Sequence, residues 1–485
     1  MTELNPRIVD YINLHFGEDY LNKFKEFIQI DYKPYIRIPL RYKHLKIDEK
    51  LRKYHIKLEP VKSVDGAFLV TDGVANIGKT LEFTVGKYYI QSLSSMIPPL
   101  IMNLKQDDVV LDLCASPGSK TSQIADYMGY RGTLYANEPN MERTKSLVHN
   151  LDRMGLSNLG VMMQKGQILS KYFENKFDKI LVDAPCSALG IVQKRGEVGE
   201  RWSLTEAERI SEIQFKLLVS AIKMAKIGGE IIYSTCTLTL EENEVVLNKI
   251  LNKYPVELVD IELPVKSMPG FTSFLNEQMH PSLEKAHRII PWEITSEGFF
   301  VAKLRKTGES EAAIPANPGK SKYEIISYDN KLIKHYLGDI AKHYGVQPEV
   351  FENYNFIVKG MDIFIIDSLW EADDLSLFER IGLKLGSVDK RNKAHLHSIS
   401  ARILDEHITE NIIVLDSRED LNTYFSGGTI KRNFKPYGHM VIKYEDYIIG
   451  TALALPEGLK SQFPRALRTH QVAFKDFSLA EEVGE

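Results

Sequence analysis

Residues 108–128 read DVVLDLCASPGSKTSQIADYM, and the fold class follows from this stretch. An apolar run typical of a strand is followed by a turn of small residues and then by a helical pattern. The same order returns at 132–155, 177–190 and 228–251. Repeated strand, turn and helix patterns are typical of βαβ units, so the sequence predicts an α/β, doubly wound Rossmann-like core. The looser alternation in 288–304 predicts a closing pair of strands.

The length of 485 residues predicts about three domains at roughly 150 residues each. We expect a basic, aromatic N-terminal region at 1–75, the α/β domain at 76–305, a linker at 306–322 and a mixed or β-rich region at 323–485. The linker prediction rests on TGESEAAIPANPGKSK, which lacks hydrophobic periodicity. Strands are expected in the last region at NFIVKG, MDIFIID, GHMVIKY and DYIIGTALAL.

The composition excludes several classes of protein. With 44% apolar and 26% charged residues, the chain is an ordinary globular protein and is neither disordered nor collagenous. The N-terminus lacks a secretory signal, and no run approaches the roughly 20 apolar residues that cross a bilayer, so we expect a cytoplasmic protein. The three cysteines are odd in number and form no CxxC motif, which argues against a disulfide framework or a zinc site.

Two basic stretches stand out although the net charge is −4. Residues 33–62 hold ten Lys and Arg against three Asp and Glu, with Tyr32, Tyr35 and Tyr42 interleaved. Residues 427–470 hold seven basic side chains against three acidic ones. Basic and aromatic side chains together suit an RNA backbone and its bases, whereas the alternative for each stretch is a solvated charged face.

The turn at 112–121, DLCASPGSKT, is a candidate cofactor loop. It is no P-loop because Ser119 separates Gly118 from Lys120, and it also lacks the GxGxxG pattern of dinucleotide sites. Small residues without a phosphate nest favour a nucleoside cofactor without pyrophosphate, such as S-adenosylmethionine, over an ordinary tight turn. The candidate cofactor-binding residues are Ala115, Ser116, Pro117, Gly118, Ser119, Lys120 and Thr121.

Further candidates follow the other apolar runs. Glu138 lies 26 residues beyond Asp112. A carboxylate at this position can accept hydrogen bonds from the ribose hydroxyls of a nucleotide, or alternatively can stabilise the N-terminus of the helix that follows. Cys186 in DAPCS and Cys236 in STCT each follow a strand pattern. Ligands bind at the carboxyl ends of parallel strands, so we expect both thiols to face the crevice of the cofactor loop. A single cysteine there would more simply be a small buried hydrophobe.

The chain resembles a known family through these motifs. DLCASPGSKT, ANE, DAPCSALG and STCTLTLEENE, in this order and spacing, are similar to the motifs of the NOL1/NOP2/Sun family of RNA cytosine-5 methyltransferases. GKYYIQSLSSMIPP from Gly86, Arg288, Pro291 and EGFFVAKL extend the resemblance over about 86–304. The SPGSKTSQIA loop and the C-terminal LKSQFPRALR are most similar to the bacterial 16S ribosomal RNA methyltransferase F group.

The resemblance implies a class I methyltransferase core that binds S-adenosylmethionine, and a PUA-like RNA-binding module at about 395–475. It implies that Cys236 is the nucleophile that adds to carbon 6 of cytosine, and that Cys186 helps release the product. Asp183 fits the role of a general acid or hydrogen-bond partner of the target cytosine, and it is also a candidate contact of the cofactor. Lys120 can pair with Asp183 or lower the pKa of a thiol. A target base inside a helix has to be unpaired or flipped out.

Two positions depart from the family pattern. Lys165, in MMQKGQIL, stands where the family carries an aspartate that contacts the adenine end of the cofactor, and Gln164 or Gln167 could replace that contact. Ala188 stands where a glycine is usual, which narrows the turn slightly.

The sequence therefore predicts an RNA (cytosine-5-)-methyltransferase that forms 5-methylcytosine in 16S ribosomal RNA through a covalent cysteine–cytosine adduct. We expect a monomer that binds RNA or the small ribosomal subunit, without a membrane or a metal. The alternatives are a transfer RNA methyltransferase, or an RNA-binding ribosome-assembly factor that has lost turnover, which Lys165 would favour. The interpretation as a dehydrogenase is disfavoured, because the sequence lacks the glycine pattern of a dinucleotide site and because both cysteines would then have no role.

Overall fold

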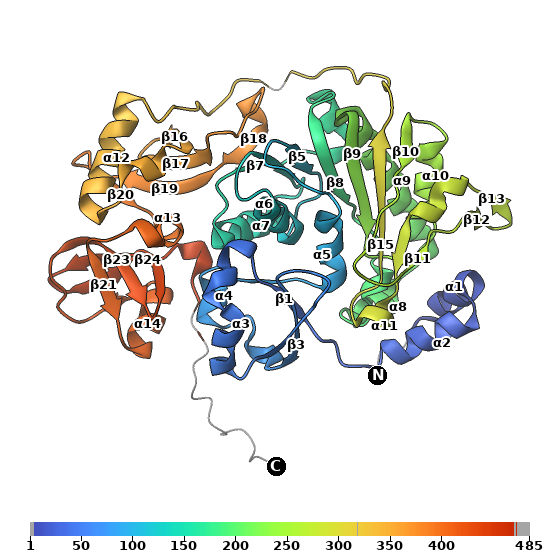
Figure 1. The fold of residues 1–485 in the computed structure, drawn as a ribbon, viewed down its shortest axis with the longest axis horizontal. Helices are drawn as coiled ribbons and strands as arrows, with labels where there is room; N and C mark the ends of the chain where they lie inside the picture. The colour runs from blue at the N-terminus through green and yellow to red at the C-terminus, as the bar shows by residue number, and fades with distance from the viewer. Residues whose placement is uncertain (1–3, 318, 470–471, 473–485) are drawn as a thin grey trace, which may run out of the picture.

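The computed structural model describes residues 4–317, 319–469 and 472, and it centres on a ten-stranded sheet (Figure 1). Five neighbouring strands in the order β9-β8-β5-β6-β7 run parallel. They are β5 (Val109–Asp112), β6 (Thr133–Asn137), β7 (Leu159–Met162), β8 (Phe177–Asp183) and β9 (Ala225–Thr235). These strands read as continuous apolar runs because helices cover both faces of the sheet. The predicted doubly wound α/β core is confirmed.

The helices divide between the two faces of this sheet. α5 (Leu93–Leu100), α6 (Ser119–Tyr127) and α7 (Met141–Met154) share a hydrophobic core with one face. α9 (Leu204–Met224) and α10 (Glu244–Leu251) pack against the other face. Between them the two layers leave the carboxyl ends of the parallel strands as the edge where ligands can enter.

Antiparallel strands extend the sheet beyond β9. They are β15 (Phe299–Lys306), β14 (His287–Ile289), β11 (Ser267–Pro269) and β10 (Val256–Leu258), with β10 paired to β15. The predicted closing pair within 288–304 corresponds to β14 and β15, which pair directly. This end of the domain also carries α8 (Gly196–Arg201), α11 (Pro291–Ile294) and the small hairpin of β12 (Ser273–Phe274) and β13 (Glu277–Gln278).

The C-terminal region forms two further sheets. The first contains β16 (Tyr354–Lys359), β17 (Asp362–Asp367), β19 (Leu383–Val388) and β20 (Ala394–Leu396), beside α12 (Lys331–Tyr344). The second contains β21 (Ile412–Leu415), β22 (Thr429–Ile430), β23 (Gly438–Tyr444), β24 (Tyr447–Leu455) and β25 (Gly458–Ser461), with α13 (Ser398–Ile403) and α14 (Arg418–Phe425). The four predicted strands of this region correspond to β16, β17, β23 and β24.

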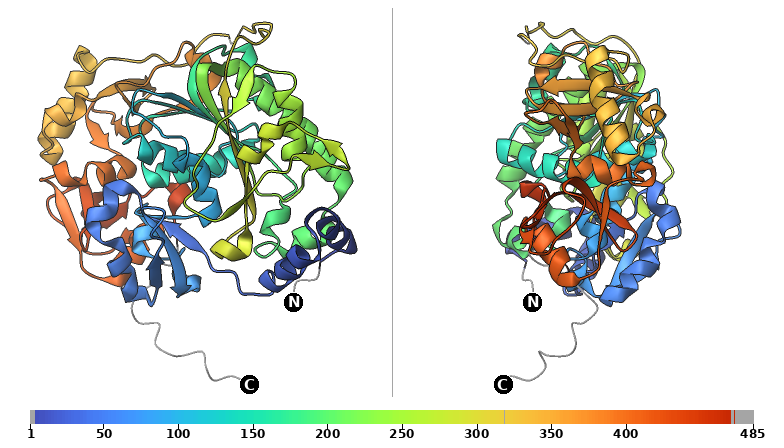
Figure 2. Two further views of the ribbon diagram at one scale, coloured as in Figure 1. Left: turned by 45° about the vertical axis from the view of Figure 1, so that its right-hand side comes forward. Right: turned by 90° about the vertical axis from the view of Figure 1, so that its left-hand side faces the viewer.

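The C-terminal region also completes the central sheet. β18 (Phe378–Ile381) pairs antiparallel with β7, and Trp370 and Phe378 pack against Tyr135 of β6. Residues 307–325, apart from the undescribed 318, contain no helix or strand and run over the top of the molecule (Figures 1 and 2). The chain therefore leaves the α/β domain in the predicted linker and returns to its sheet.

The N-terminal region divides in two. α1 (Pro6–Phe16) and α2 (Glu18–Phe27) pack against Leu189, Trp202 and Leu238 of the α/β domain. β1 (Tyr35–Arg37), β2 (Lys57–Pro60), β3 (Ala67–Asp72) and β4 (Tyr89–Ile90) form a small sheet near α3 (Ile47–Lys50) and α4 (Leu81–Thr84). That sheet shares one hydrophobic core with the C-terminal region (Figure 1). Within the described residues, no helix is long and apolar enough to span a membrane.

Candidate active site

A cavity of about 470 Å³ lies at the carboxyl ends of the parallel strands. Residues that follow all five parallel strands line it: Leu113, Cys114, Ser116 and Pro117 after β5, Glu138, Pro139 and Arg143 after β6, Gly166 and Gln167 after β7, Asp183, Ala184, Pro185 and Cys186 after β8, and Cys236 after β9. Ala188, Ile191, Arg195, Ile213 and Leu217 complete the walls. In an open α/β sheet this edge is where ligands bind, and the volume lies within the roughly 300–1,000 Å³ typical of small-molecule sites.

The two predicted cysteines meet in this cavity. β8 and β9 are parallel neighbours with Asp183 opposite Ser234, so the residues that follow each strand come together. The Sγ atoms of Cys186 and Cys236 lie 3.0 Å apart, and both cysteines are free thiols. The hydrogen bond to Cys236, together with burial, raises the pKa of the Cys186 thiol well above its ordinary value. The arrangement therefore disfavours two thiolates at once, so one thiol can react while the other stays protonated.

A buried carboxylate ties the two cysteine loops together. Glu242 accepts hydrogen bonds from the backbone N–H of Ser187 at 2.8 Å, from the Ser187 hydroxyl, from Thr239 Oγ1 at 2.7 Å and from Gln214 Nε2 at 3.0 Å. Ser187 follows Cys186, and its hydroxyl also lies 3.0 Å from Thr237 Oγ1, next to Cys236. Burial raises the pKa of Glu242. This residue therefore sets the spacing of both thiols without touching either.

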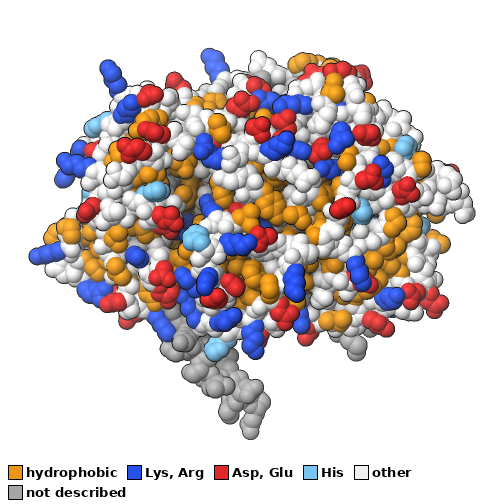
Figure 3. Space-filling model, viewed as in Figure 1, with side chains coloured by type: hydrophobic (Ala, Val, Ile, Leu, Met, Phe, Trp, Pro, Cys, Tyr) orange, Lys and Arg blue, Asp and Glu red, His pale blue; other side chains and the backbone are white. Residues whose placement is uncertain are grey.

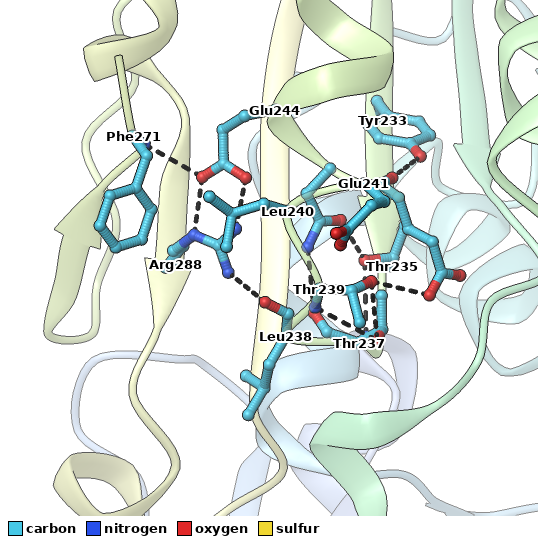
Figure 4. A network of polar contacts seen from close by, with 12 residues as sticks. Tyr233, Thr235, Thr237, Leu238, Thr239, Leu240, Glu241, Glu244, Phe271 and Arg288 are labelled. Carbon is cyan, nitrogen blue, oxygen red and sulfur yellow. Dashed lines mark hydrogen bonds and ion pairs between the residues drawn. The ribbon is translucent and has the colours of Figure 1, made fainter. Parts of the chain in front are cut away.

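The segment after Cys236 is anchored from the far side as well (Figure 4). Arg288 of β14 forms a two-pronged ion pair with Glu244 of α10 and donates to the carbonyl of Leu238 at 2.8 Å. Both charged side chains are buried. Glu244 also accepts the backbone N–H of Phe271 at 3.1 Å. The start of α10 is thereby fixed against the antiparallel part of the sheet.

Asp183 and Lys120 form an ion pair at the cavity wall. Lys120 Nζ lies 2.7 Å from Asp183 Oδ2 and 2.8 Å from Ser95 Oγ, and Ser234 donates to Asp183 Oδ1 at 2.8 Å. The predicted pairing of Lys120 with Asp183 is confirmed. Lys120 itself is buried and does not line the cavity, so its role is to orient Asp183, which does.

Comparison with known proteins identifies the family. A family model described as 16S rRNA methyltransferase RsmB/F matches residues 99–305. Ribosomal RNA small subunit methyltransferase F from Shewanella woodyi is 30% identical over 91% of this chain and 92% of its own length. The chain belongs to this RsmB/F family of methyltransferases. The resemblance to the NOL1/NOP2/Sun proteins is thereby confirmed.

Two further relatives share mainly the core. The tRNA (cytosine(49)-C(5))-methyltransferase of Pyrococcus abyssi is 33% identical and covers 63% of this chain and 97% of its own length. A solved methyltransferase homologue from Pyrococcus horikoshii is 29% identical, with a TM-score of 0.55, and covers 61% of this chain and 93% of its own. The methyltransferase fold is therefore common to all of them, whereas the RsmB/F relative extends over nearly the whole chain.

The RsmB/F loop at 112–121 places its residues in two groups. Ser116 and Pro117 line the cavity. Gly118 has a φ of +102°, and a Cβ there would lie 3.1 Å from Leu147, so only glycine suits this close approach of loop and helix. The remaining candidates, Ala115, Ser119, Lys120 and Thr121, form the wall behind the lining or belong to the first turn of α6.

Asp112 is a buried carboxylate that sequence reasoning missed as a site residue. Its Oδ2 accepts the Thr121 hydroxyl at 2.7 Å, while its buried Oδ1 has no hydrogen-bond partner among the described residues. Burial raises the pKa of Asp112 to about 7. Its position at the end of a buried strand was the available signal, since an acid there needs a partner.

Glu138 follows β6 directly, at the carboxyl edge of the sheet. It is buried, lines the cavity, accepts the N–H of Asn140 at 3.0 Å and pairs with Arg143 at 3.3 Å. The helix-stabilising alternative is met, because α7 begins at Met141. Arg143 was not predicted, since nothing in its sequence context distinguishes it from a solvated helix residue.

The structure shows different consequences for the two positions that depart from the family pattern, Lys165 and Ala188. Lys165 is exposed and does not line the cavity, whereas Gln167 does. Ala188 adopts a left-handed conformation with φ +61°, which a glycine reaches without strain and which costs other residues about 1–2 kcal/mol. The alanine therefore strains the turn after Cys186, in addition to the slight narrowing expected from sequence.

The basic N-terminal stretch is largely engaged within the protein. Arg37 is buried and donates to Gln91 and Ser122. Ion pairs join Lys43 to Asp65, Lys50 to Asp446, Lys53 to Glu82 and Glu445, and Lys57 to Asp72. Tyr35 is buried and donates to a backbone carbonyl. Of these lysines, only Lys50 and Lys53 pair with acids of the C-terminal region, whereas Lys43 and Lys57 form exposed pairs within the N-terminal region.

Proposed function

We propose that this RsmB/F methyltransferase forms 5-methylcytosine in RNA, with 16S ribosomal RNA as its substrate. The observation that carries the proposal is the pair of thiols, Cys186 and Cys236, 3.0 Å apart in one cavity beside the Asp183–Lys120 pair. A relative named for the small ribosomal subunit aligns over 91% of the chain, and one named for transfer RNA over 63%. This difference favours ribosomal RNA over transfer RNA.

The cavity residues fit S-adenosylmethionine. Apolar walls at Leu113 and Pro139 suit an adenine ring, and the buried Glu138 suits ribose hydroxyls. The carboxylate of Asp183 at the cavity wall suits a ligand that carries an ammonium and a sulfonium group. The buried Asp112, whose Oδ1 has no hydrogen-bond partner among the described residues, directly precedes the lining residue Leu113. The cofactor supplies an electrophilic methyl group when bound. Gln167 occupies the wall nearest to the position where the family has its adenine-contacting acid.

Cytosine needs activation before methylation because its carbon 5 is a weak nucleophile. Addition of the Cys236 thiolate to carbon 6 makes carbon 5 electron-rich, and a proton passed from the Lys120–Asp183 pair to the ring nitrogen through Asp183 offsets the negative charge that develops there. After methylation of carbon 5, a base removes its proton and the sulfur–carbon 6 bond breaks, which returns the electron pair to Cys236. Cys186, 3.0 Å away, assists this release.

We infer that the five-stranded sheet β21 to β25 is the PUA-like RNA-binding module expected at about 395–475. It is a small mixed sheet in which β21 and β23 run parallel and the other pairs antiparallel. Exposed Lys431, Lys435 and Arg465 lie within this part of the chain. The proposed RNA contact thus rests on the C-terminal region more than on the N-terminal one.

The test is transfer of labelled methyl groups from S-adenosylmethionine to ribosomal RNA and, separately, to transfer RNA. Cys236→Ala should abolish labelling, and Cys186→Ala should accumulate a protein–RNA adduct that resists denaturation. Lys216→Ala, at an exposed position that does not line the cavity, is the control and should retain activity. Labelling of transfer RNA alone would contradict the substrate assignment. RNA binding without any labelling would favour an assembly factor that has lost turnover.

A further inference from the structure

A second, larger cavity lies between α7 and the C-terminal region. Its volume is about 810 Å³, and it takes one wall from a face of α7 and the other from β17 to β19, α13 and the segment 464–467. We call it the α7 groove. It is separate from the active-site cavity, with which it shares no lining residue.

We propose that the α7 groove binds an unstacked nucleotide of the substrate RNA outside the target cytosine. This inference rests on the proposed function, because it assigns the groove to the same RNA. Three features carry it: the charge of its rim, the apolar character of its floor and its position beside the active site.

The rim of the groove is basic. Four cations, Lys145, Arg380, Lys384 and Arg465, line it against two carboxylates, Asp152 and Glu379. Arg380 is held by Asp152, and Lys384 lies 2.8 Å from Asp362. Lys145 is paired only with the exposed Glu142 on its own helix, and the described residues give Arg465 no ion-pair partner. These last two cations therefore remain available to phosphates, and they come from opposite walls.

The floor of the groove is apolar and reaches the surface. Met141 is 59% exposed, and Val148 and Phe364, which line the same groove, are half-buried. Figure 3 shows hydrophobic side chains in the middle of one face of the molecule, with both basic and acidic side chains around them. A flat base has apolar faces and a charged backbone, so an unstacked nucleotide matches both parts of the groove.

Two histidines add polar groups without charge. Burial lowers the pKa of His149, and burial lowers the pKa of His397 to about 3, so both are neutral at pH 7. Nδ1 of His397 accepts the N–H of Ile399 at 3.4 Å, which leaves the ring proton on Nε2 as a donor. A neutral donor in an apolar floor suits the edge of a base and disfavours a purely electrostatic contact.

The position of the groove links it to catalysis. α7 borders both cavities: Arg143 lines the active site, while Met141 and Lys145 line the groove. An RNA strand with its target base in the active site can therefore continue along α7 toward the C-terminal region. The groove would hold a neighbouring nucleotide in place and so contribute to the choice of substrate.

The experiment measures binding of a short single-stranded RNA oligonucleotide to the full-length protein at several salt concentrations. The double variant Lys145→Ala/Arg465→Ala should reduce the magnitude of the slope of log K against log salt by about 1.4, because two phosphate contacts to a single strand are lost at about 0.7 each. Met141→Ala should weaken binding by about 3- to 10-fold at every salt concentration with an unchanged slope. Lys216→Ala/Lys331→Ala is the matched control, since both lysines are exposed and lie outside the groove.

A cross-link gives an independent readout. An oligonucleotide with 4-thiouridine, irradiated on the wild-type protein, should label the tryptic peptide 146–153, which carries Val148 and His149. Labels confined to other peptides, or a salt slope that the Lys145→Ala/Arg465→Ala variant leaves unchanged, would overturn the proposal. The proposal would also be overturned if the wild-type protein formed a dimer that the Met141→Arg variant does not form, because the groove would then bind a second copy of the chain.

Methyl transfer separates this proposal from the proposed function. If labelled methyl is transferred but the groove variants bind RNA like the wild type, only the groove assignment fails. If no cytosine is methylated but RNA binding depends on Lys145, Arg465 and Met141, only the proposed function fails. Affinity for S-adenosylmethionine should stay unchanged in every groove variant.

Discussion

At the scale of single residues, Glu242 shows how a group that touches no substrate can govern two reactive ones. Its carboxylate accepts three hydrogen bonds from the two cysteine loops and a fourth from Gln214 of α9. Glu242→Gln replaces one acceptor oxygen by a donor, and the N–H groups of Ser187 and Gln214 cannot accept from it. We expect a loss of about 1–3 kcal/mol in the free energy of unfolding and a 10- to 100-fold lower rate of methyl transfer. Urea unfolding and single-turnover kinetics measure the two effects.

The neighbouring Glu241→Gln is the matched control. Glu241 accepts the hydroxyl of Tyr11 on α1 at 2.6 Å and does not join the cysteine loops. It should leave the rate within about threefold of the wild type, since no reactive group moves. Equal rates in Glu242→Gln and the wild type would show that the loops hold their spacing without this carboxylate.

Asp112 makes stability depend on pH. Burial raises its pKa to about 7 in the folded chain, against an ordinary value of 3.8. Between these values the folded state binds more protons than the unfolded state, so this group's contribution to stability falls as pH rises, by about 1.4 kcal/mol per pH unit. Asp112→Asn keeps an acceptor for Thr121 and removes the titration. Its free energy of unfolding relative to the wild type should rise from pH 5 to 7 and level off above, as measured by urea unfolding without ligand; a flat difference would contradict the shifted pKa.

The sequence predicted the site residues that take part directly in the chemistry better than the residues that position them. Cys186, Cys236, Asp183 and Lys120 lie in short motifs after strand patterns, and the parallel topology then brings them to one edge. Arg143 and Glu242 could not be recognised, because their roles depend on partners far away in sequence or on which way a loop turns. The strain at Ala188 likewise depends on a backbone conformation that its residue type disfavours.

At the scale of elements, the ion pair of Arg288 and Glu244 fixes α10 to β14 (Figure 4). Arg288→Met leaves a buried carboxylate without its charge partner and should cost about 3–5 kcal/mol. Adding Glu244→Leu should restore much of this loss, because two apolar side chains can fill the same space. Urea unfolding of the three proteins measures the difference.

An exposed pair serves as the control for this prediction. Lys249 lies 2.9 Å from Glu212 between α10 and α9, with both side chains substantially exposed. Lys249→Met should cost no more than about 1 kcal/mol. A similarly small cost for Arg288→Met would mean that water reaches Glu244 and that α10 is not held by this pair.

Elements were predictable where the pattern is local. Strands β5, β8 and β9 are apolar runs followed by polar turns, and β23 and β24 are largely apolar runs on either side of a short turn. β18 could not be predicted, because FERI is short and half polar, and its pairing is determined by the exposed edge of β7.

At the scale of the whole molecule, regions that the sequence separates share their cores. The N-terminal sheet packs with the C-terminal region in one hydrophobic cluster, and Lys50 and Lys53 pair with Asp446 and Glu445 across that contact. Composition identifies a linker, but it does not show which apolar surfaces of the regions before and after the linker are buried against each other. The predicted boundary near residue 306 therefore separates segments of sequence that remain joined in space.

The chain should consequently not tolerate a cut at this linker. A fragment of residues 1–306 loses β18 from the edge of β7 and exposes the apolar half of the shared cluster, including Ile36, Leu51 and Tyr88. An unpaired edge strand beside exposed apolar surface favours aggregation. We expect this fragment to aggregate, or to unfold at a much lower temperature than the full chain. A monomeric 1–306 fragment with a cooperative transition close to that of the full chain, seen by calorimetry and light scattering, would show that the α/β domain folds without its C-terminal strand.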